Sequence, residues 1–166
     1  NHLEYDWQSP IWSHLLHALA AEHRLIRYDE RGNGLSDWDV DDISFDAFVS
    51  DLESVVEATG LQRFALLGIS QGCAVSIAYA VRHPERVSHL VLYGGFARGR
   101  NRRDVAQSDT LIALIRQGWG QENPAFRQFF TSLFVPEGTP EQMQWFNDLQ
   151  RITTSPENAA RILEAT

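Results

Sequence analysis

The feature that most constrains the fold is a serine placed directly after a short apolar run. Residues 64–69 read FALLGI, and the following residues complete the pattern G-x-S-x-G, with Ser70 at its centre. A helical sequence then continues to the residue before Pro84, because proline cannot extend a helix. Strand, sharp turn and helix in this order predict a nucleophile elbow, in which the turn lifts the serine hydroxyl above a sheet.

Each position of the motif has an expected role. Gly68 and Gly72 flank the serine, where we expect side chains to clash with neighbouring backbone. The turn places the Gln71 amide at the start of a helix, where an N–H group can stabilise an oxyanion. We therefore predict Ser70 as the nucleophile and Gln71 as an oxyanion donor. The alternative is that Ser70 is an ordinary turn residue of another α/β sheet.

Helical and strand-like stretches alternate on both sides of the motif. The strand-like stretches are apolar on both faces, which is typical of a buried parallel sheet in an α/β fold. Ser9 and Pro10 are suited to begin the first helix. The expected elements are a helix over 10–23, a strand over 24–29, a loop over 30–37, a helix over 44–60, a strand over 64–69, a helix over 71–82 and a strand over 89–95.

The rest of the chain is helical in pattern and rich in aromatic residues. We expect two parts, a partial α/β core over residues 1–98 and a helical cap or lid over 99–166. The aromatic residues either pack between helices or line an apolar substrate pocket under the lid. The expected helices cover 109–119, 124–134, 140–152 and 155–166.

Charge and composition exclude several classes of function. The net charge is −8 and the basic cluster over 98–103 is short, so we expect no nucleic-acid binding. No apolar run approaches the ~20 residues of a membrane span, so we expect no membrane association. The lone Cys73 is expected to be packed and inert, and it favours a reducing, cytoplasmic location. The only methionine is Met143, so we expect an upstream segment to be missing.

No cofactor or metal is expected. The turn at Ser70 is not G-x-G-x-x-G, and the chain has no G-K-[ST] of a P-loop. Residues 37–42 read DWDVDD, which begins like a calcium loop. However, Asp42 occupies the position that requires glycine and Phe48 the position that requires glutamate.

Three stretches together resemble the α/β-hydrolase superfamily: residues 12–37 with D-x-R-G-x-G-x-S, the elbow FALLGISQG, and residues 78–95. The resemblance implies that residues 104–166 form an inserted helical lid. The opening HLEYDWQSPIW also resembles hydrolase-like domains that are attached to bacterial signalling or DNA-binding modules.

Two further parts of the family pattern are missing. The family places an acid and then a histidine after the serine, but only His83 and His89 follow Ser70, and neither is placed to act as its base. The segment 96–98 after the strand carries no carboxylate. We therefore expect a fragment that lacks the acid and the base of its triad, with Asn1 and His2 at the tail of the loop that gives a second oxyanion donor.

Two functions remain open. The first is an esterase-like serine hydrolase acting on a small ester-like or hydrophobic ligand through an acyl-serine, weak or inactive as this fragment. The second is a non-catalytic sensor or ligand-binding module of a signalling or transcription regulator. Incomplete sheet edges also predict self-association.

Overall fold

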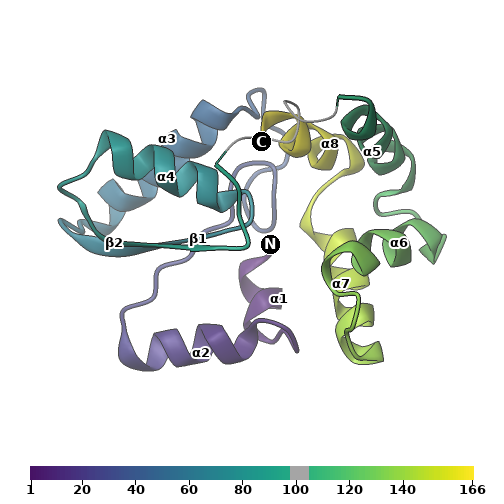
Figure 1. The fold of residues 1–166 in the computed structure, drawn as a ribbon, viewed down its shortest axis with the longest axis horizontal. Coiled ribbons are helices and arrows are strands. Elements are labelled where there is room, and N and C mark those ends of the chain that lie inside the picture. Colours follow the sequence, from purple (N-terminus) through teal and green to yellow (C-terminus); the bar gives the residue numbers. More distant parts are fainter. Residues whose placement is uncertain (98–104) are drawn as a thin grey trace. The chain divides into compact units, whose positions relative to one another are not determined.

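The computed structural model, drawn in Figure 1, describes residues 1–97 and 105–166. The chain divides into two units. Unit 1 comprises Asn1–Val40 and Leu111–Ala160, and unit 2 comprises Asp41–Thr110 and Arg161–Thr166. The predicted boundary at 98/99 and the basic cluster over 98–103 lie outside the described residues. In chain order the elements are α1 (Leu3–Trp7), α2 (Ser13–Glu22), α3 (Phe45–Thr59), β1 (Phe64–Ile69), α4 (Gly72–Arg82), β2 (Val87–Tyr93), α5 (Val105–Gly118), α6 (Pro124–Phe134), α7 (Pro140–Thr153) and α8 (Pro156–Ala165).

Unit 2 is built on two parallel strands with helices on one face. β1 and β2 pair in parallel, from Phe64 opposite Val87 to Ile69 opposite Tyr93. Both α3 and α4 lie on the same side of this sheet (Figure 1). The predicted parallel α/β arrangement is confirmed.

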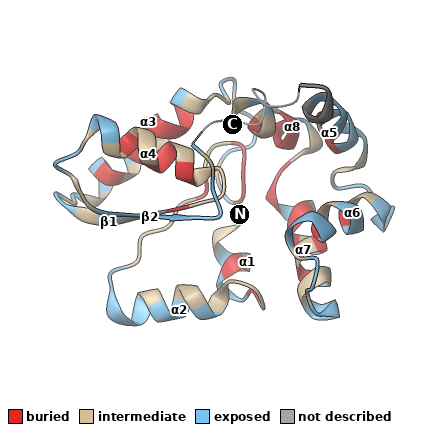
Figure 2. Ribbon diagram, viewed as in Figure 1, coloured by how far each residue is buried: buried red, intermediate tan, exposed pale blue. Residues whose placement is uncertain are grey.

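Local signals fix the limits of α3 as the sequence predicts. The Ser44 hydroxyl accepts a hydrogen bond from the Ala47 amide at the start of the helix, and Gly60 ends it with a left-handed φ of 68°. The core of unit 2 lies between α3 and α4, where Figure 2 shows the buried residues of the two helices. Phe48 and Val49 of α3 and Tyr79 of α4 are almost fully enclosed there.

The prediction that both faces of each strand are buried is wrong for the described chain. Exposed and partly covered positions alternate along most of β1, and β2 is exposed from His89 to Tyr93. The apolar side chains Leu90, Val91 and Leu92 are all exposed. The reason is that the described sheet has only the strands β1 and β2, so the other edge of β2 has no strand beside it among the described residues.

Several element limits also differ from the predictions. β2 covers 87–93 rather than 89–95, since the left-handed φ of 59° at Gly94 ends the strand. α2 begins at Ser13, because the Ser9 hydroxyl accepts from the amides of Ile11 and Trp12 and so caps the preceding turn. α5 begins four residues before its predicted start.

The strand predicted over 24–29 does not form. These residues have no regular secondary structure. A strand exists only when another strand pairs with its backbone, and none of the described residues pairs with this segment. Its polar side chains instead bind α1, as the Arg27 guanidinium donates to the Leu3 carbonyl oxygen.

The helices α6 and α7 of unit 1 form where the sequence predicts them. Thr139 and Gln142 form a capping box at the start of α7. Aromatic rings run along α6 at four-residue spacing, and Phe134 stacks on Phe146 of α7. The helices also bury polar groups, and these groups bind one another. The Thr131 hydroxyl donates to Asn147 Oδ1 at 2.6 Å and accepts from Gln150 Nε2 at 2.9 Å.

In unit 1, the junction of α7 and α8 is bonded to the loop that follows residue 31. The Thr154 hydroxyl donates to the Gly32 carbonyl oxygen at 2.5 Å, and the Gly34 amide donates to the Thr153 carbonyl oxygen at 2.6 Å. Asn158 Nδ2 donates to the Trp38 carbonyl oxygen at 2.8 Å. Because Thr153, Thr154 and Asn158 are all buried, water cannot replace these bonds without exposing the junction.

We expect Thr154→Val to destabilise unit 1 by about 0.5–1.5 kcal/mol, because the valine keeps the shape but removes one hydrogen bond. The buried Gly32 carbonyl oxygen keeps only its longer bond from Asn158 Nδ2, at 3.4 Å. Urea unfolding followed by tryptophan fluorescence measures this, since all five tryptophans lie in unit 1. The control is Ser132→Ala, because Ser132 is exposed and its hydroxyl donates to the Phe129 carbonyl oxygen of the same helix. Equal stability losses in the two variants would contradict the prediction.

Candidate active site

Ser70 lies at the turn between β1 and α4 in an unusual backbone conformation. Its φ is 54°, and it is the only residue other than glycine with a positive φ in the described part of the chain. Such a conformation costs of order 1–3 kcal/mol, and surrounding structure must hold it. Here the Ser70 amide donates to the Tyr93 carbonyl oxygen at 3.0 Å, and the Ser70 carbonyl oxygen accepts from the Cys73 amide at 3.0 Å. The side chain is partly exposed.

The two glycines of the motif have different roles. A Cβ at Gly68 would lie 2.7 Å from the Gly72 carbonyl oxygen and 2.9 Å from Cys73 Cα. The predicted clash is therefore real at Gly68. At Gly72 the prediction is wrong, because a Cβ there meets nothing within 4 Å among the described atoms, and Gly72 does not have a positive φ. Close packing between strand and helix fixes the first glycine only.

Gln71 occupies the position before α4. It is the N-cap, with φ −58° and ψ −31°, so its amide lies at the end of the helix where the helix dipole favours negative charge. This is the arrangement in which an amide can stabilise an oxyanion beside Ser70. The role of Gln71 as an oxyanion donor stays a prediction.

The structure places neither downstream histidine near Ser70. His83 caps the far end of α4, about 16 Å along the helix from its start, and its Nε2 lies 2.9 Å from Glu53 Oε1. His89 is exposed in β2 and pairs in register with Ala65, at the end of the sheet opposite Ser70. Asp104, one of the carboxylates after β2, lies outside the described residues.

Tyr79 is not placed to act as a base in place of these histidines. Its ring is buried and lies against the rings of Phe64 and His83. Burial, and then the nearby negative charge of Glu53, raises the pKa of the Tyr79 hydroxyl above its ordinary value. The phenol therefore stays protonated at neutral pH.

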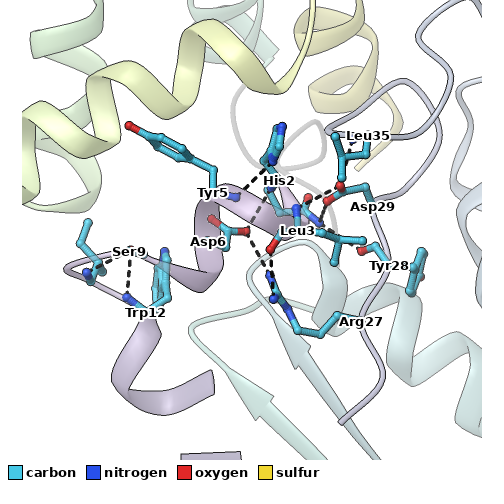
Figure 3. A network of polar contacts seen from close by, with 12 residues as sticks. His2, Leu3, Tyr5, Asp6, Ser9, Trp12, Arg27, Tyr28, Asp29 and Leu35 are labelled. Atoms are coloured by element: carbon cyan, nitrogen blue, oxygen red, sulfur yellow. Dashed lines mark hydrogen bonds and ion pairs between the residues drawn. The ribbon is translucent and has the colours of Figure 1, made fainter. Parts of the chain in front are cut away.

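A carboxylate network of unit 1, which the sequence analysis missed, occupies the amides of the N-terminal turn (Figure 3). Asp29 accepts from Asn1 Nδ2 at 3.1 Å, from the Leu3 amide at 3.1 Å and from the Leu35 amide at 2.9 Å. A Cβ at Gly34 would lie 2.2 Å from Asp29 Oδ2. This contact explains the second glycine of the D-x-R-G-x-G motif.

A second carboxylate holds the start of α1. Asp6 is buried, its Oδ2 accepts from the His2 amide at 3.1 Å, and it lies 3.7 Å from the Arg27 guanidinium. His2 Nδ1 in turn accepts from the Tyr5 amide at 3.2 Å. The amides of His2 and Leu3 are therefore bound within unit 1. That Asn1 and His2 end a loop that gives a second oxyanion donor stays a prediction.

Two further features are absent from the part of the chain that the structure describes. No three histidine, cysteine, aspartate or glutamate side chains of residues 1–97 and 105–166 gather closely enough to hold a metal ion. Within the same ranges, none of the helices has both the length and the apolar character needed to cross a membrane.

Comparison with known proteins identifies the family of the chain. A family model described as "alpha/beta hydrolase fold" matches residues 6–162. Pyrrolizixenacetamide deacetylase of Xenorhabdus hominickii is 31% identical over 105 residues, which are 63% of this chain and 40% of that protein.

Solved structures show the same relationship. An esterase from Exiguobacterium antarcticum superposes with a TM-score of 0.77 at 26% identity, covering 98% of this chain and 59% of the esterase. A hydrolase from Pseudomonas aeruginosa superposes with a TM-score of 0.73 at 26% identity, covering 93% of this chain and 58% of that chain. The chain thus spans between two fifths and three fifths of the length of these relatives. With most of its length matched, from the N-terminal turn through the elbow to α8, the chain belongs to the alpha/beta hydrolase family.

Proposed function

We propose that this chain carries the nucleophile of a serine hydrolase that works through an acyl-serine intermediate. The observation that supports the proposal is the left-handed backbone of Ser70 between a parallel strand and a helix, since strain of this kind gathers at functional positions. An esterase and a deacetylase among the similar proteins both suggest transfer of an acyl group to water. We therefore propose a small ester-like or hydrophobic acyl compound as the substrate.

In this mechanism the Ser70 oxygen attacks the carbonyl carbon of the substrate, and the hydroxyl proton passes to a general base. The Gln71 amide stabilises the negative charge that develops on the carbonyl oxygen. The alcohol or amine leaves with a proton and Ser70 is acylated. Water then attacks the acyl-serine, releases the carboxylic acid and restores the hydroxyl.

We also propose that the acid and base of the complete triad are not supplied by this chain. His83 is paired with Glu53 at the far end of α4, and His89 lies at the wrong end of the sheet. A serine hydroxyl without a base is a weak nucleophile at neutral pH. Two contributions to catalysis do not need the base, namely the binding and orientation of the substrate and the oxyanion donor. In well-studied proteases these still give roughly 10³–10⁴-fold acceleration over water.

The second candidate is a hydrolase-like module that binds a ligand without turning it over. The positions of His83 and His89 favour this reading, because neither can accept the Ser70 proton. A fluorophosphonate experiment on the full-length protein that contains this chain distinguishes the two candidate functions. Rapid labelling of Ser70 by a fluorophosphonate supports the enzyme, whereas ligand binding without labelling supports the sensor.

For the 166-residue chain itself, we expect slow fluorophosphonate labelling of Ser70. In the Ser70→Ala variant, we expect no label on the peptide that contains residue 70. Gly68→Ala should slow labelling at least about tenfold, the equivalent of ~1.4 kcal/mol, because the new Cβ moves the turn while the helices remain. Peptide mass spectrometry locates the label, and far-UV circular dichroism checks the fold. Labelling spread evenly over surface serines would show that Ser70 is not activated.

We further propose that the chain self-associates through the outer face and free edge of its sheet. Val91 of β2 is 52% exposed, its neighbours Leu90 and Leu92 are exposed as well, and an unpaired apolar strand is a template for pairing with another chain. The proposal commits to a second copy of this chain as the partner, because the stretch VSHLVLY carries no Asp, Glu, Lys, Arg or Pro that would block strand pairing.

Val91→Lys should therefore shift the chain toward monomer in size-exclusion chromatography with light scattering. The matched control is Val81→Lys, because Val81 is 75% exposed on α4, away from the sheet. We expect the control to behave as the unmodified chain does. A monomeric unmodified chain at the highest concentration tested, or an equal shift in both variants, would refute pairing through β2.

A further inference from the structure

The thiol of Cys73 lies where the end of β1, the first turn of α4 and the end of β2 meet. Cys73 is 1% exposed, and its Sγ lies 3.2 Å from the Gly68 carbonyl oxygen and 3.6 Å from the Tyr93 carbonyl oxygen. A thiol has one proton to donate, and the shorter contact is to Gly68. The side chain that the sequence analysis expected to be merely packed therefore contacts the carboxyl ends of both strands beside Ser70.

Gly95 lies against the same thiol. A Cβ built at Gly95 would lie 2.1 Å from Cys73 Sγ and 2.3 Å from Cys73 Cβ, and 2.8 Å from the Ser70 carbonyl oxygen. Gly95 does not have a positive φ, so the position requires glycine for space and not for its backbone conformation. The segment after β2 thus leaves no room for a side chain between Gly95 and either the thiol or the peptide of Ser70.

These contacts reach Ser70 through the end of β2. The Tyr93 carbonyl oxygen, two residues before Gly95, accepts the Ser70 amide at 3.0 Å. A shift of Gly95 away from the thiol would move this acceptor, and the strained φ of Ser70 would lose one of its two backbone bonds. The hydrogen bond of a thiol is weak, but a sulfur atom fills an irregular space well. We therefore expect both the volume of the Cys73 sulfur and the hydrogen bond of its thiol to hold Gly95 and the end of β2 in place.

We propose that Cys73 and Gly95 are a positioning pair for Ser70. The thiol and the bare backbone of Gly95 fit against each other, and together they keep the Tyr93 carbonyl oxygen under the Ser70 amide. Neither residue contacts the reacting atoms. The consequence for catalysis rests on the proposed role of Ser70 as nucleophile, whereas the positioning itself does not.

Amide hydrogen exchange by NMR on the whole chain tests the thiol. Cys73→Ala should speed exchange of the Ser70 amide about two- to fivefold, the change that a weak hydrogen bond supports. The reference amides are those of Phe64, which donates to the Arg86 carbonyl oxygen, and Leu66, which faces β2 in the same alternation as Phe64 and Ser70. Cys73→Ser keeps a hydrogen-bond donor, so the Ser70 amide in this variant should exchange almost as slowly as in the unmodified chain. The matched control is Val75→Ala, because Val75 is buried in the same helix and should change the Ser70 and β1 amides alike.

A double-mutant cycle tests the fit between the two residues. Gly95→Ala should speed Ser70 exchange by about tenfold or more, since its Cβ has no room. Cys73→Gly removes both side-chain atoms that this Cβ would meet, so the double variant should protect the Ser70 amide better than Gly95→Ala alone. If Gly95→Ala does not fold, the Cys73 variants still decide the matter.

Two results would overturn the positioning pair. One is a Cys73→Ala effect on Ser70 no larger than that of Val75→Ala. The other concerns the fold-increase in the exchange rate of the Ser70 amide. The pair is refuted if this increase in the double variant equals or exceeds the product of the increases in Gly95→Ala and Cys73→Gly. Because amide exchange does not require Ser70 to react, failure of fluorophosphonate labelling would count against the proposed function and leave this inference standing.

Discussion

Two backbone hydrogen bonds at Ser70 hold the rest of the site in place. One joins its amide to the Tyr93 carbonyl oxygen of β2, and the other joins its carbonyl oxygen to the Cys73 amide in the first turn of α4. Each is worth about 0.5–1.5 kcal/mol in net stability, which is comparable to the cost of a left-handed serine. The strained turn therefore persists only while the parallel register of β1 and β2 keeps the Tyr93 carbonyl oxygen in reach and α4 begins directly after the turn.

Unit 1 is organised by a different constraint, the burial of carboxylates that accept backbone amides. Asp29 binds the N-terminal turn and the following loop together, and Gly34 is needed because the carboxylate occupies the space of a side chain. The same loop is bonded to Thr153 and Thr154 at the end of α7. A D-x-R-G-x-G motif thus has a structural role here, in which the aspartate collects amide donors and the glycine makes room for it.

The parts of the fold that could be predicted from sequence are those whose signals are local. A serine cap and a terminal glycine give the limits of α3, proline marks the first turn of α6, and the elbow follows from its own short pattern. The strand expected over 24–29 did not form because a short strand-like sequence specifies no partner, and strand pairing depends on residues far away in the sequence. The Asp29 network was missed for the same reason, since two of its donors lie 26 and 28 residues away. Gly72 shows the opposite error, because a motif position was given a steric role that this backbone does not require.

The backbone conformation of Ser70 in solution tests the central claim most directly. Scalar couplings between backbone nuclei distinguish a positive from a negative φ, and they can be measured in the chain labelled with ¹³C and ¹⁵N. The account predicts a left-handed Ser70 with φ near 54°, in an otherwise ordinary strand–turn–helix. A negative φ at Ser70 in the folded chain would mean that the turn is relaxed, and both the nucleophile and its positioning pair would have to be abandoned.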